Sequence, residues 1–453
     1  MKKLILTVLG AMMLAVPAVQ AQKMNRAVLM GAIEKSDAEA QDVKKNTKAA
    51  VWIKRAQAYF AALEAPTKEC FKTMPAEQLK KLLGEPKSVT TVDIAGGPAP
   101  GPAECYSYSN IDIYLRNGQV YTWSVTKDLV PDTYAKIMES FDQAYALDPK
   151  QAPKIKAELL KLVNYYAGYA ETNYEAAKFN EAGEGYSTIY RTQQHPAYGE
   201  PAQAEFAYNA GYCYLQAGLQ NVPEAYEKGL PCLQASIENG YAADGNAYYY
   251  LSCIYQGLAQ NAEGDARMDL LQNAKSALEE GISKYPSNDL IVNGFLMLFN
   301  VEPSLGDPTE LTELIKSAIE RDPESLSMWL CLATVNYKMQ NFDEAIEASK
   351  QAYNLYPDLY DTNYYVGCFY AAKGDACVEQ MSQKSYTRQA DYDADLEAMN
   401  ACYRDAVPYL EKAFGLQPSK NMAEMLRSIF FRLRDEDGMM DKFNHYKAVA
   451  EEM

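Results

Sequence analysis

Histidine is nearly absent from this 453-residue sequence, and its scarcity limits the enzyme classes that the chain can support. His195 and His445 are the only two histidines. The chain therefore has very few side chains from which a histidine-based catalytic triad or a zinc site could be built. The sequence also has no nucleophile elbow, P-loop, dinucleotide-binding fingerprint or Cys-x-x-Cys motif. We therefore expect no catalytic residues, no metal and no cofactor, and an ordinary surface or packing role for both histidines.

Basic residues are scarce relative to acidic ones. The chain has 43 lysines and arginines against 60 aspartates and glutamates, which gives a formal net charge of -17 at pH 7. A field of this sign repels phosphate backbones and anionic lipids, so nucleic acid is not an expected partner. The many carboxylates leave open an enzyme that uses two of them for acid and base catalysis, although most should lie on solvated helix faces.

Long apolar runs are confined to the N-terminus. Lys2 and Lys3, the apolar run 4–16 and the small residue Ala21 form the pattern of a secretory signal peptide. No later stretch approaches the roughly 18 apolar residues that a membrane-spanning helix needs. Cleavage after Ala21 would place Gln22 first, where a lipoprotein needs a cysteine. We expect an exported chain without a membrane segment or lipid anchor, located in the periplasm or peripherally at the outer membrane.

A repeated pair of amphipathic helices organises most of the remaining chain. The most regular copy spans 326–359, where two helical patterns of apolar residues are joined by a short polar turn. Small residues allow the two helices to approach closely, and a proline ends the second helix. The motif residues of this copy are Trp329, Leu332, Ala333, Ala345, Ala352 and Pro357. Their spacing resembles the tetratricopeptide (TPR) motif, which implies an all-α, right-handed solenoid of stacked helix pairs.

Weaker copies of the motif bring the expected number of repeats to about seven. One copy is stretched between Gly367 and Pro418, with the extra residues between its two helices. The first copy is split by a long insertion into an opening helix and a distant returning helix. The motif residues of the split copy are Trp52, Ala56, Tyr59, Ile137, Phe141 and Ala144.

The periodicity changes within the insertion. Residues 74–86 predict a short helix that ends at glycine and proline, and a loop rich in both residues follows at 96–102. Alternating residues on both sides of Asn117-Gly118 predict a β-hairpin, because both turn residues favour positive φ. Residues 66–126 resemble the small SmpA/OmlA-type fold of outer-membrane-assembly lipoproteins. We expect the insertion either to decorate one end of the solenoid or to offer a second docking surface.

The chain length alone would suggest several globular domains. The repeated helix pairs instead predict one continuous repeat array. In such an array each repeat buries its apolar face only against its neighbours. The predicted segments are a signal peptide at 1–21, N-terminal helices that open the first repeat at 22–63, the inserted helix and β-hairpin at 64–131, the TPR solenoid at 132–418 and capping helices at 419–453.

The TPR resemblance also implies where a partner would bind. In TPR proteins the first helix of each pair lines the concave surface, and its second, fifth, ninth and twelfth positions face the bound segment. The corresponding groove residues are Asn164, Tyr174, Glu205, Tyr208, Tyr212, Asn246, Tyr249, Thr334, Tyr337, Asp361 and Tyr364. Tyrosine dominates this set, although helix packing is the alternative role for each of these rings. A neutral to acidic aromatic groove should prefer an apolar, basic or carbohydrate ligand.

Among the nine cysteines, two pairs are candidates for disulfide bonds. Cys377 and Cys402 bracket the extension of the stretched repeat, and Cys70 and Cys105 bracket the helix of the insertion. Several of the other cysteines fall inside first helices, where a small buried apolar residue is the simpler explanation.

These patterns predict a non-catalytic scaffold of the bacterial cell envelope that binds a protein or peptide through its tyrosine-rich concave groove. Two alternatives from other classes stay open. One is a glycan-binding protein similar to the SusD-type receptors, which also carry TPR units and stack sugars on aromatic rings. The other is an envelope hydrolase that uses two carboxylates.

Overall fold

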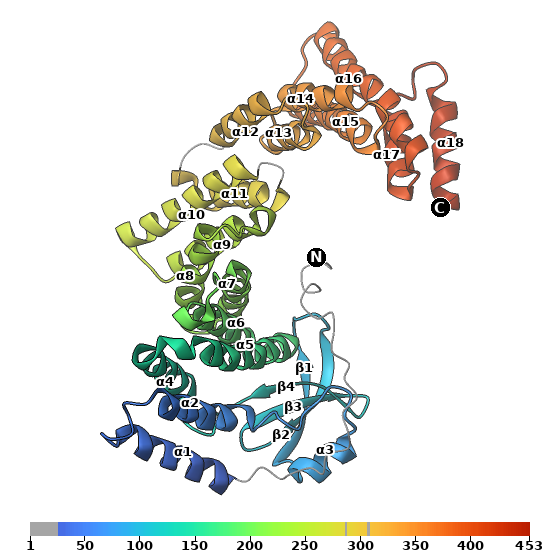
Figure 1. The fold of residues 1–453 in the computed structure, drawn as a ribbon. Coiled ribbons are helices and arrows are strands. Elements are labelled where there is room, and N and C mark those ends of the chain that lie inside the picture. The colour runs from blue at the N-terminus through green and yellow to red at the C-terminus, as the bar shows by residue number, and fades with distance from the viewer. Residues whose placement is uncertain (1–25, 286–287, 306–308) are drawn as a thin grey trace. The chain divides into compact units, whose positions relative to one another are not determined.

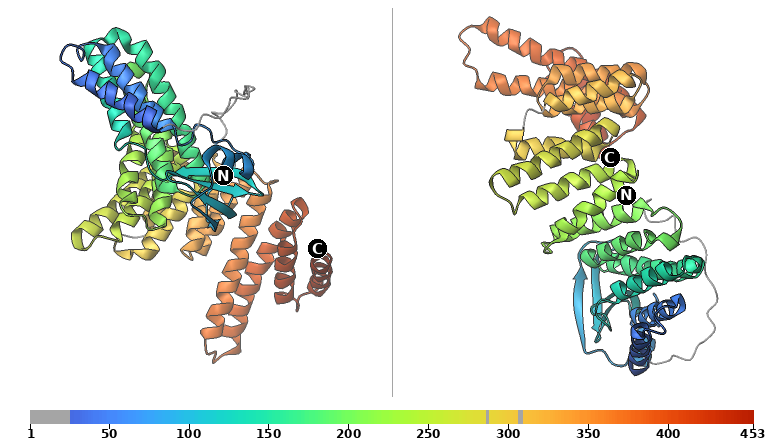
Figure 2. Two further views of the ribbon diagram at one scale, coloured as in Figure 1. Left: turned by 90° about the horizontal axis from the view of Figure 1, so that it is seen from below. Right: turned by 60° about the vertical axis from the view of Figure 1, so that its left-hand side comes forward.

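Two compact units make up the chain, and helical hairpins dominate both of them (Figure 1 and Figure 2). The structure is a computed structural model. It describes residues 26–285, 288–305 and 309–453, so the predicted signal peptide at 1–21 lies outside the described residues. The units are Met1–Tyr241 and Ala242–Met453. Within the described ranges, no helix is long and apolar enough to cross a membrane.

The first helix pair of the first unit joins segments that are far apart in the sequence. After α1 (Arg26–Gln41), α2 (Ala49–Glu64) packs on α4 (Thr133–Leu147). Their interface contains Ile53, Ala56, Tyr59, Ile137, Phe141 and Ala144. None of these side chains is more than 4% exposed. The two distant segments that the sequence predicts to form one repeat therefore pack on each other.

Two more helix pairs complete the first unit. They are α5 (Ala152–Glu175) with α6 (Phe179–Gln193), and α7 (Ala204–Leu219) with α8 (Ala225–Glu238). Gly211 on α7 shows why the motif needs a very small residue at this position. A Cβ atom on Gly211 would lie 2.5 Å from Cγ of Leu233 on α8, so any side chain here would force the two helices apart.

The insertion folds as a helix and a four-stranded antiparallel sheet with the strand order β1-β2-β3-β4. Its elements are α3 (Ala76–Leu83), β1 (Ser88–Ile94), β2 (Gly101–Ser107), β3 (Ile111–Arg116) and β4 (Gln119–Val125). The predicted helix and the hairpin at Asn117-Gly118 are confirmed, with φ values of 51° and 72° at the two turn residues. The strands β1 and β2 were not expected. The loop predicted at 96–102 is in fact the turn between them, and β2 begins at Gly101.

One face of this sheet packs on the insertion's own helix and the other packs on α5. On the α5 side, the hydroxyl of Thr122 on β4 donates a hydrogen bond of 2.7 Å to the carbonyl oxygen of Thr172. The ammonium group of Lys72 forms ion pairs of 2.8 and 2.9 Å with Glu171 and Glu175. The insertion therefore does more than decorate an end of the array, because it covers part of a first helix on which groove residues were expected.

The second unit contains three helix pairs, two further helices and two closing helices. The pairs are α9 (Asn246–Ala259) with α10 (Gly264–Lys284), α13 (Leu326–Lys338) with α14 (Phe342–Leu355), and α15 (Tyr360–Gln383) with α16 (Gln389–Leu416). Between the first two of these pairs, α11 (Asp289–Val301) packs on α9 and α10, and α12 (Thr309–Arg321) packs on α10 and α13. The closing helices are α17 (Lys420–Arg432) and α18 (Met439–Glu452). Across the described residues of both units there are six such pairs together with α11 and α12, in agreement with the predicted all-α fold of TPR type with a small inserted sheet.

The stretched repeat is longer because both of its helices are longer. α15 has 24 residues and α16 has 28, and a short connection joins them. At the base of this hairpin, Gly367 lies against Leu410, where an added Cβ atom would approach Cγ to 2.5 Å. The same close approach of helices that defines the other pairs is thus retained here, and the extra residues extend the far end of the hairpin.

Candidate functional site

A row of contacting aromatic rings crosses two neighbouring first helices of the second unit. Tyr337 on α13 is 41% exposed, and its ring centroid lies 5.1 Å from that of Phe369 on α15. From Phe369 the contacts continue along α15 to Tyr365 at 5.7 Å and then to Tyr364 at 5.6 Å. Tyr364 stacks on Tyr360 with a centroid distance of 5.5 Å and an interplanar angle of 12°. We call these five side chains the α13–α15 aromatic row.

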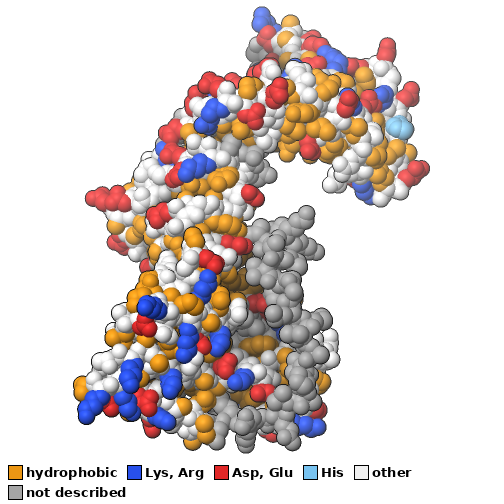
Figure 3. Space-filling model, in the orientation of Figure 1, with side chains coloured by type: hydrophobic (Ala, Val, Ile, Leu, Met, Phe, Trp, Pro, Cys, Tyr) orange, Lys and Arg blue, Asp and Glu red, His pale blue; other side chains and the backbone are white. Residues whose placement is uncertain are grey.

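The side chains around the aromatic row are apolar or contain sulfur. Figure 3 shows hydrophobic side chains gathered over the part of the second unit that contains α13, α15 and α17. The thiol of Cys368 lies beside Tyr364 and 3.9 Å from the sulfur of Met425 on α17. The neighbouring thiol and burial raise the pKa of Tyr364 to about 12, so its hydroxyl is protonated and able to donate a hydrogen bond at neutral pH.

Only some of the predicted groove residues of these helices belong to the row. Tyr337 and Tyr364 do, and Asp361 is exposed one residue after Tyr360. Thr334 instead turns its hydroxyl onto its own helix, with a hydrogen bond of 2.8 Å to the carbonyl oxygen of Leu330. The set predicted from motif positions missed Tyr360, Tyr365 and Phe369. The four-residue spacing that links 360 to 364 and 365 to 369 on one helix was the available signal.

The predicted groove residues of α9 are engaged in helix packing. The side chain of Asn246 accepts a hydrogen bond of 2.9 Å from Asn288 at the start of α11. Tyr249 is half-buried against Gly294, where an added Cβ atom would lie 2.8 Å from its ring. The structure therefore places both residues between α9 and α11 and does not bring them into contact with the α13–α15 aromatic row.

The predicted residues of the first unit require one correction. Tyr208 is only 4% exposed, and its ring meets that of Tyr241 at 5.5 Å, so it fills the core and does not face a groove. Tyr174 and Tyr212 are half-buried and interact with each other through their side chains beside the inserted sheet. Asn164 is exposed, and Glu205 is half-buried on α7.

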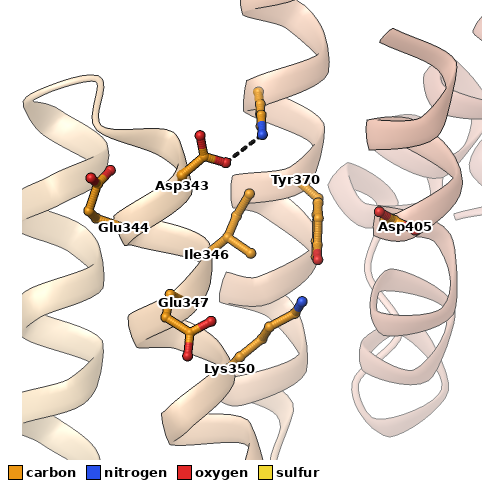
Figure 4. A pocket seen from close by; sticks show the side chains of 8 residues that line it. Asp343, Glu344, Ile346, Glu347, Lys350, Tyr370 and Asp405 are labelled. Carbon is orange, nitrogen blue, oxygen red and sulfur yellow. Dashed lines mark hydrogen bonds and ion pairs between the residues drawn. The ribbon is translucent and has the colours of Figure 1, made fainter. Parts of the chain in front are cut away.

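A separate hollow of about 590 Å³ lies among α14, α15 and α16 (Figure 4). Its lining residues are Asp343, Glu344, Ile346, Glu347, Lys350, Tyr370, Lys373 and Asp405. The ammonium group of Lys350 lies 5.1 Å above the ring of Tyr370, and Lys373 forms an ion pair with Asp343. Because its cations already have partners within the hollow, we regard these contacts as stabilising the helix pairs.

The two predicted cysteine pairs have different surroundings, and all nine thiols are free in the structure. Cys377 and Cys402 lie in contact across the α15–α16 hairpin, where burial and the neighbouring thiol raise the pKa of Cys402 to about 11. A bridge between them stays a prediction. Cys70 and Cys105 belong to clusters on opposite faces of the inserted sheet, so the structure does not bring them together.

His195 has the packing role expected for it. Its Nδ1 atom accepts a hydrogen bond of 3.0 Å from the backbone N–H of Ala197, and its Nε2 atom lies 3.4 Å from a carboxylate oxygen of Asp142. His195 is 5% exposed, and this burial lowers the pKa of its imidazole despite the opposing effect of Asp142. The folded chain therefore favours neutral histidine at this position.

Acidification should consequently destabilise the first unit. The unfolded chain takes up a proton at His195 near pH 6.5, whereas the folded chain resists protonation until the pH is lower, so stability falls as the pH drops below about 6.5. We expect a lower thermal unfolding midpoint at pH 5 than at pH 7.5. Asparagine at this position retains a capping acceptor without titrating, so His195→Asn should reduce the pH dependence. The exposed control His445→Asn should leave it unchanged, and equal behaviour of the two variants would contradict the assignment.

Comparisons with known proteins give partial similarities. No family model matches the sequence. Interferon-induced protein with tetratricopeptide repeats 2 of Cricetulus griseus is 27% identical over 142 residues, which are 31% of this chain and 27% of that protein. The chain thus spans about a quarter of this curated relative.

Two solved structures have low overall similarity to the chain. A TPR repeats protein from Bacteroides fragilis is 17% identical with a TM-score of 0.28, covering 63% of this chain and 98% of that one. The human IFIT1 dimer with m7Gppp-AAAA is 13% identical with a TM-score of 0.29, covering 69% of this chain and 64% of that one. The fold of this chain is established by its own helix pairs and their packing, independently of these similarities.

Among the described residues, no three side chains of histidine, cysteine, aspartate or glutamate are arranged to hold a metal ion.

Proposed function

We propose that this chain is a non-catalytic scaffold that binds a protein or peptide segment through the first helices of its second unit. The observation that carries this proposal is the α13–α15 aromatic row with its exposed member Tyr337. Tyrosine supplies a rigid ring for burial and a hydroxyl for hydrogen bonding, and aromatic anchors of this kind dominate binding energies at interfaces. Phe369 is buried at 3% exposed, and the other four rings keep exposed surface. Those four rings on two helices form a larger anchor than isolated surface tyrosines would.

The charge of the residues around the aromatic row indicates which kind of peptide segment would bind there. In the resembled family, members that bind chaperone tails use basic and asparagine residues in the groove to hold a terminal carboxylate. The equivalent positions on α13 and α15 are Thr334, Tyr337, Asp361 and Tyr364, none of which is basic. A chain with a net charge of -17 also repels acidic segments. The preferred segment should therefore be apolar or basic.

The cell envelope is the proposed place of action. The signal-like pattern at residues 1–21 supports export. The partner would then be another exported or envelope protein. Measuring the N-terminal sequence of the chain recovered from a periplasmic fraction tests this part of the proposal.

Peptide selection tests the binding site directly. A random dodecapeptide display library is selected on the full-length protein, and the binders are synthesised and titrated by fluorescence polarisation. We expect Tyr337→Ala and Tyr364→Ala each to weaken binding by about tenfold, since the loss of a buried aromatic anchor costs on the order of 1–2 kcal/mol. The matched control is Tyr392→Ala on α16, a tyrosine of similar exposure at 39% that lies outside the row. Equal effects of all three changes would remove the row from the proposal.

A glycan is the second candidate ligand because of the stacked Tyr360 and Tyr364 pair, which presents flat rings of the kind that sugars stack on. Calorimetric titration with a panel of oligosaccharides separates the two candidates. Saturable sugar binding that Tyr364→Ala abolishes, together with a failure to select peptides, would replace the peptide ligand by a glycan. Turnover of labelled oligosaccharides would instead support the weaker alternative of a carboxylate-based hydrolase.

A further inference from the structure

The two edges of the inserted sheet differ in how their backbone groups are used. β4 lies at one end of the sheet, and the segment 73–76 runs along its outer edge. The backbone N–H of Thr73 donates a hydrogen bond of 2.7 Å to the carbonyl oxygen of Val120, and the N–H of Val120 donates one of 2.9 Å to the carbonyl oxygen of Met74. β1 lies at the other end of the sheet (Figure 1). Among the described residues it pairs only with β2, so its outer edge leaves N–H and C=O groups available to another strand.

β1 also lacks the features that usually protect an edge strand from pairing. Such strands are commonly short, contain proline or lysine, or are interrupted by a bulge. The seven residues of β1, Ser-Val-Thr-Thr-Val-Asp-Ile, include no proline, lysine or arginine, and five of them are β-branched. All seven pair with β2 in one continuous register, and the apolar side chain of Val89 is 51% exposed. A regular, exposed strand of this composition is a template for a further strand.

The charges near the two ends of β1 are complementary to each other. Lys87 directly precedes the strand and Asp93 lies near its end, and both side chains are exposed and have no partner among the described residues. If two copies of β1 run antiparallel with Thr90 opposite Thr90, Lys87 of each copy lies directly opposite Asp93 of the other. Val89 then lies opposite Thr91. Cross-strand pairs of opposite charge and of threonine with threonine stabilise a sheet, and this register provides both.

The insertion differs in charge from the chain as a whole. Residues 64–131 contain seven lysines and arginines against eight aspartates and glutamates, whereas the whole chain has a formal net charge of -17. Two copies that meet at the insertion therefore avoid most of the repulsion that two strongly acidic surfaces would cause. A second copy of β1 also supplies one cation and one anion at the matching positions.

We propose that the outer edge of β1 pairs with β1 of a second copy of this chain. The two strands run antiparallel and are centred on Thr90, so two four-stranded sheets become one continuous sheet. A single strand on each side buries little surface, and we therefore expect a weak, concentration-dependent dimer. This surface is separate from the α13–α15 aromatic row, and the inference does not depend on peptide binding.

Sedimentation velocity on the full-length protein, from about 5 to about 500 µM, tests the dimer in the concentration range of weak complexes. We expect a reversible increase in sedimentation coefficient with concentration. Lys87→Glu and Asp93→Lys each replace two attractive cross-strand pairs by two repulsive ones, so each should raise the dissociation constant of the dimer about tenfold or more. Lys81→Glu makes the same charge change at an exposed position of α3, outside β1, and should leave the dimer intact.

Restoring the charge pairs should restore the dimer. The double variant Lys87→Glu/Asp93→Lys again has opposite charges at both facing positions, so it should associate as the wild-type protein does. An equimolar mixture of the two single variants should also associate, although each alone stays monomeric. In the mixed dimer the introduced glutamate lies opposite the introduced lysine, and the original lysine and aspartate lie opposite each other.

Hydrogen exchange provides a measurement that needs no variant. Backbone amides of β1 in the wild-type protein should exchange more slowly at about 500 µM than at about 5 µM, because pairing protects the outer edge. Unchanged exchange in β1, or a wild-type protein that stays monomeric over this range, would overturn the inference. A dimer that both single variants leave intact, or a mixture that fails to associate, would do the same. Protection of β1 by a display-selected peptide in a monomeric protein would assign the edge to a peptide partner instead. Circular dichroism melts of the variants verify that these exposed changes leave the fold intact.

Discussion

Replacing Phe141 by alanine should destabilise the first unit by about 3–5 kcal/mol. Phe141 lies on α4, is 2% exposed and packs with Ile53, Ala56 and Tyr59 of α2. The substitution loses the transfer free energy of the ring and leaves a cavity that rigid helices cannot fill. Urea unfolding followed by tryptophan fluorescence measures the effect. A Trp329→Phe background restricts the signal to Trp52 and Trp123 of the first unit, since the sequence has three tryptophans.

The matched control is Phe71→Ala in the same unit. Phe71 is 49% exposed, so its truncation should cost less than about 0.5 kcal/mol. The comparison tests the joining of α2 to α4 across the insertion, because Phe141 is buried only if the two helices pair. If both phenylalanines cost the same to truncate, the split repeat is wrong and α4 does not pack on α2.

The second large effect concerns the docking of the inserted sheet on α5. Gly97 has a φ of +70°, and a Cβ atom added to it would lie 2.8 Å from the carbonyl oxygen of Tyr174. Gly97→Ala should therefore combine a left-handed backbone cost of about 1–2 kcal/mol with a clash against backbone that costs a further ~1–3 kcal/mol. No side-chain rotation can relieve this clash, because the carbonyl oxygen of Tyr174 belongs to the backbone near the end of α5.

Gly118→Ala provides the comparison that isolates the clash. Gly118 has nearly the same φ of +72°, but an added Cβ atom would meet nothing within 4 Å. Both variants bear the backbone cost, and only Gly97→Ala should loosen the sheet from α5. Hydrogen exchange should then accelerate in β4 and in the second half of α5 for Gly97→Ala alone. Equal exchange in the two variants would show that the sheet does not rest on α5 as described.

Local patterns explain the parts of the fold that could be predicted. The helix pairs follow from apolar residues at helical spacing and from small residues such as Ala56 and Ala144 where helices approach. The hairpin at Asn117-Gly118 follows from two residues that accept positive φ. The strands β1 and β2 were missed because β1 is an edge strand with mostly exposed side chains, so it lacks the alternation that marks a half-buried strand.

The candidate site depended far more on tertiary packing. Tyr208 and Tyr337 were predicted alike from their motif positions, yet Tyr208 is 4% exposed and Tyr337 is 41% exposed. The difference arises because Tyr241, beyond the end of α8, covers the ring of Tyr208, and a motif position contains no information about such a neighbour. The α13–α15 aromatic row likewise needed the contact between α13 and α15 before its extent could be seen.

The sequence by itself determined the helix-pair architecture, the place of the insertion, the acidic net charge and the high tyrosine content, because these depend on residue type and on short spacings along the chain. Only the tertiary structure decided that the inserted sheet rests on α5 and that Tyr337 lies against Phe369. Both contacts join residues that are distant in the chain, and their geometry is set by burial and hydrogen bonds such as that between Thr122 and Thr172. Short-range patterns contain no record of such contacts.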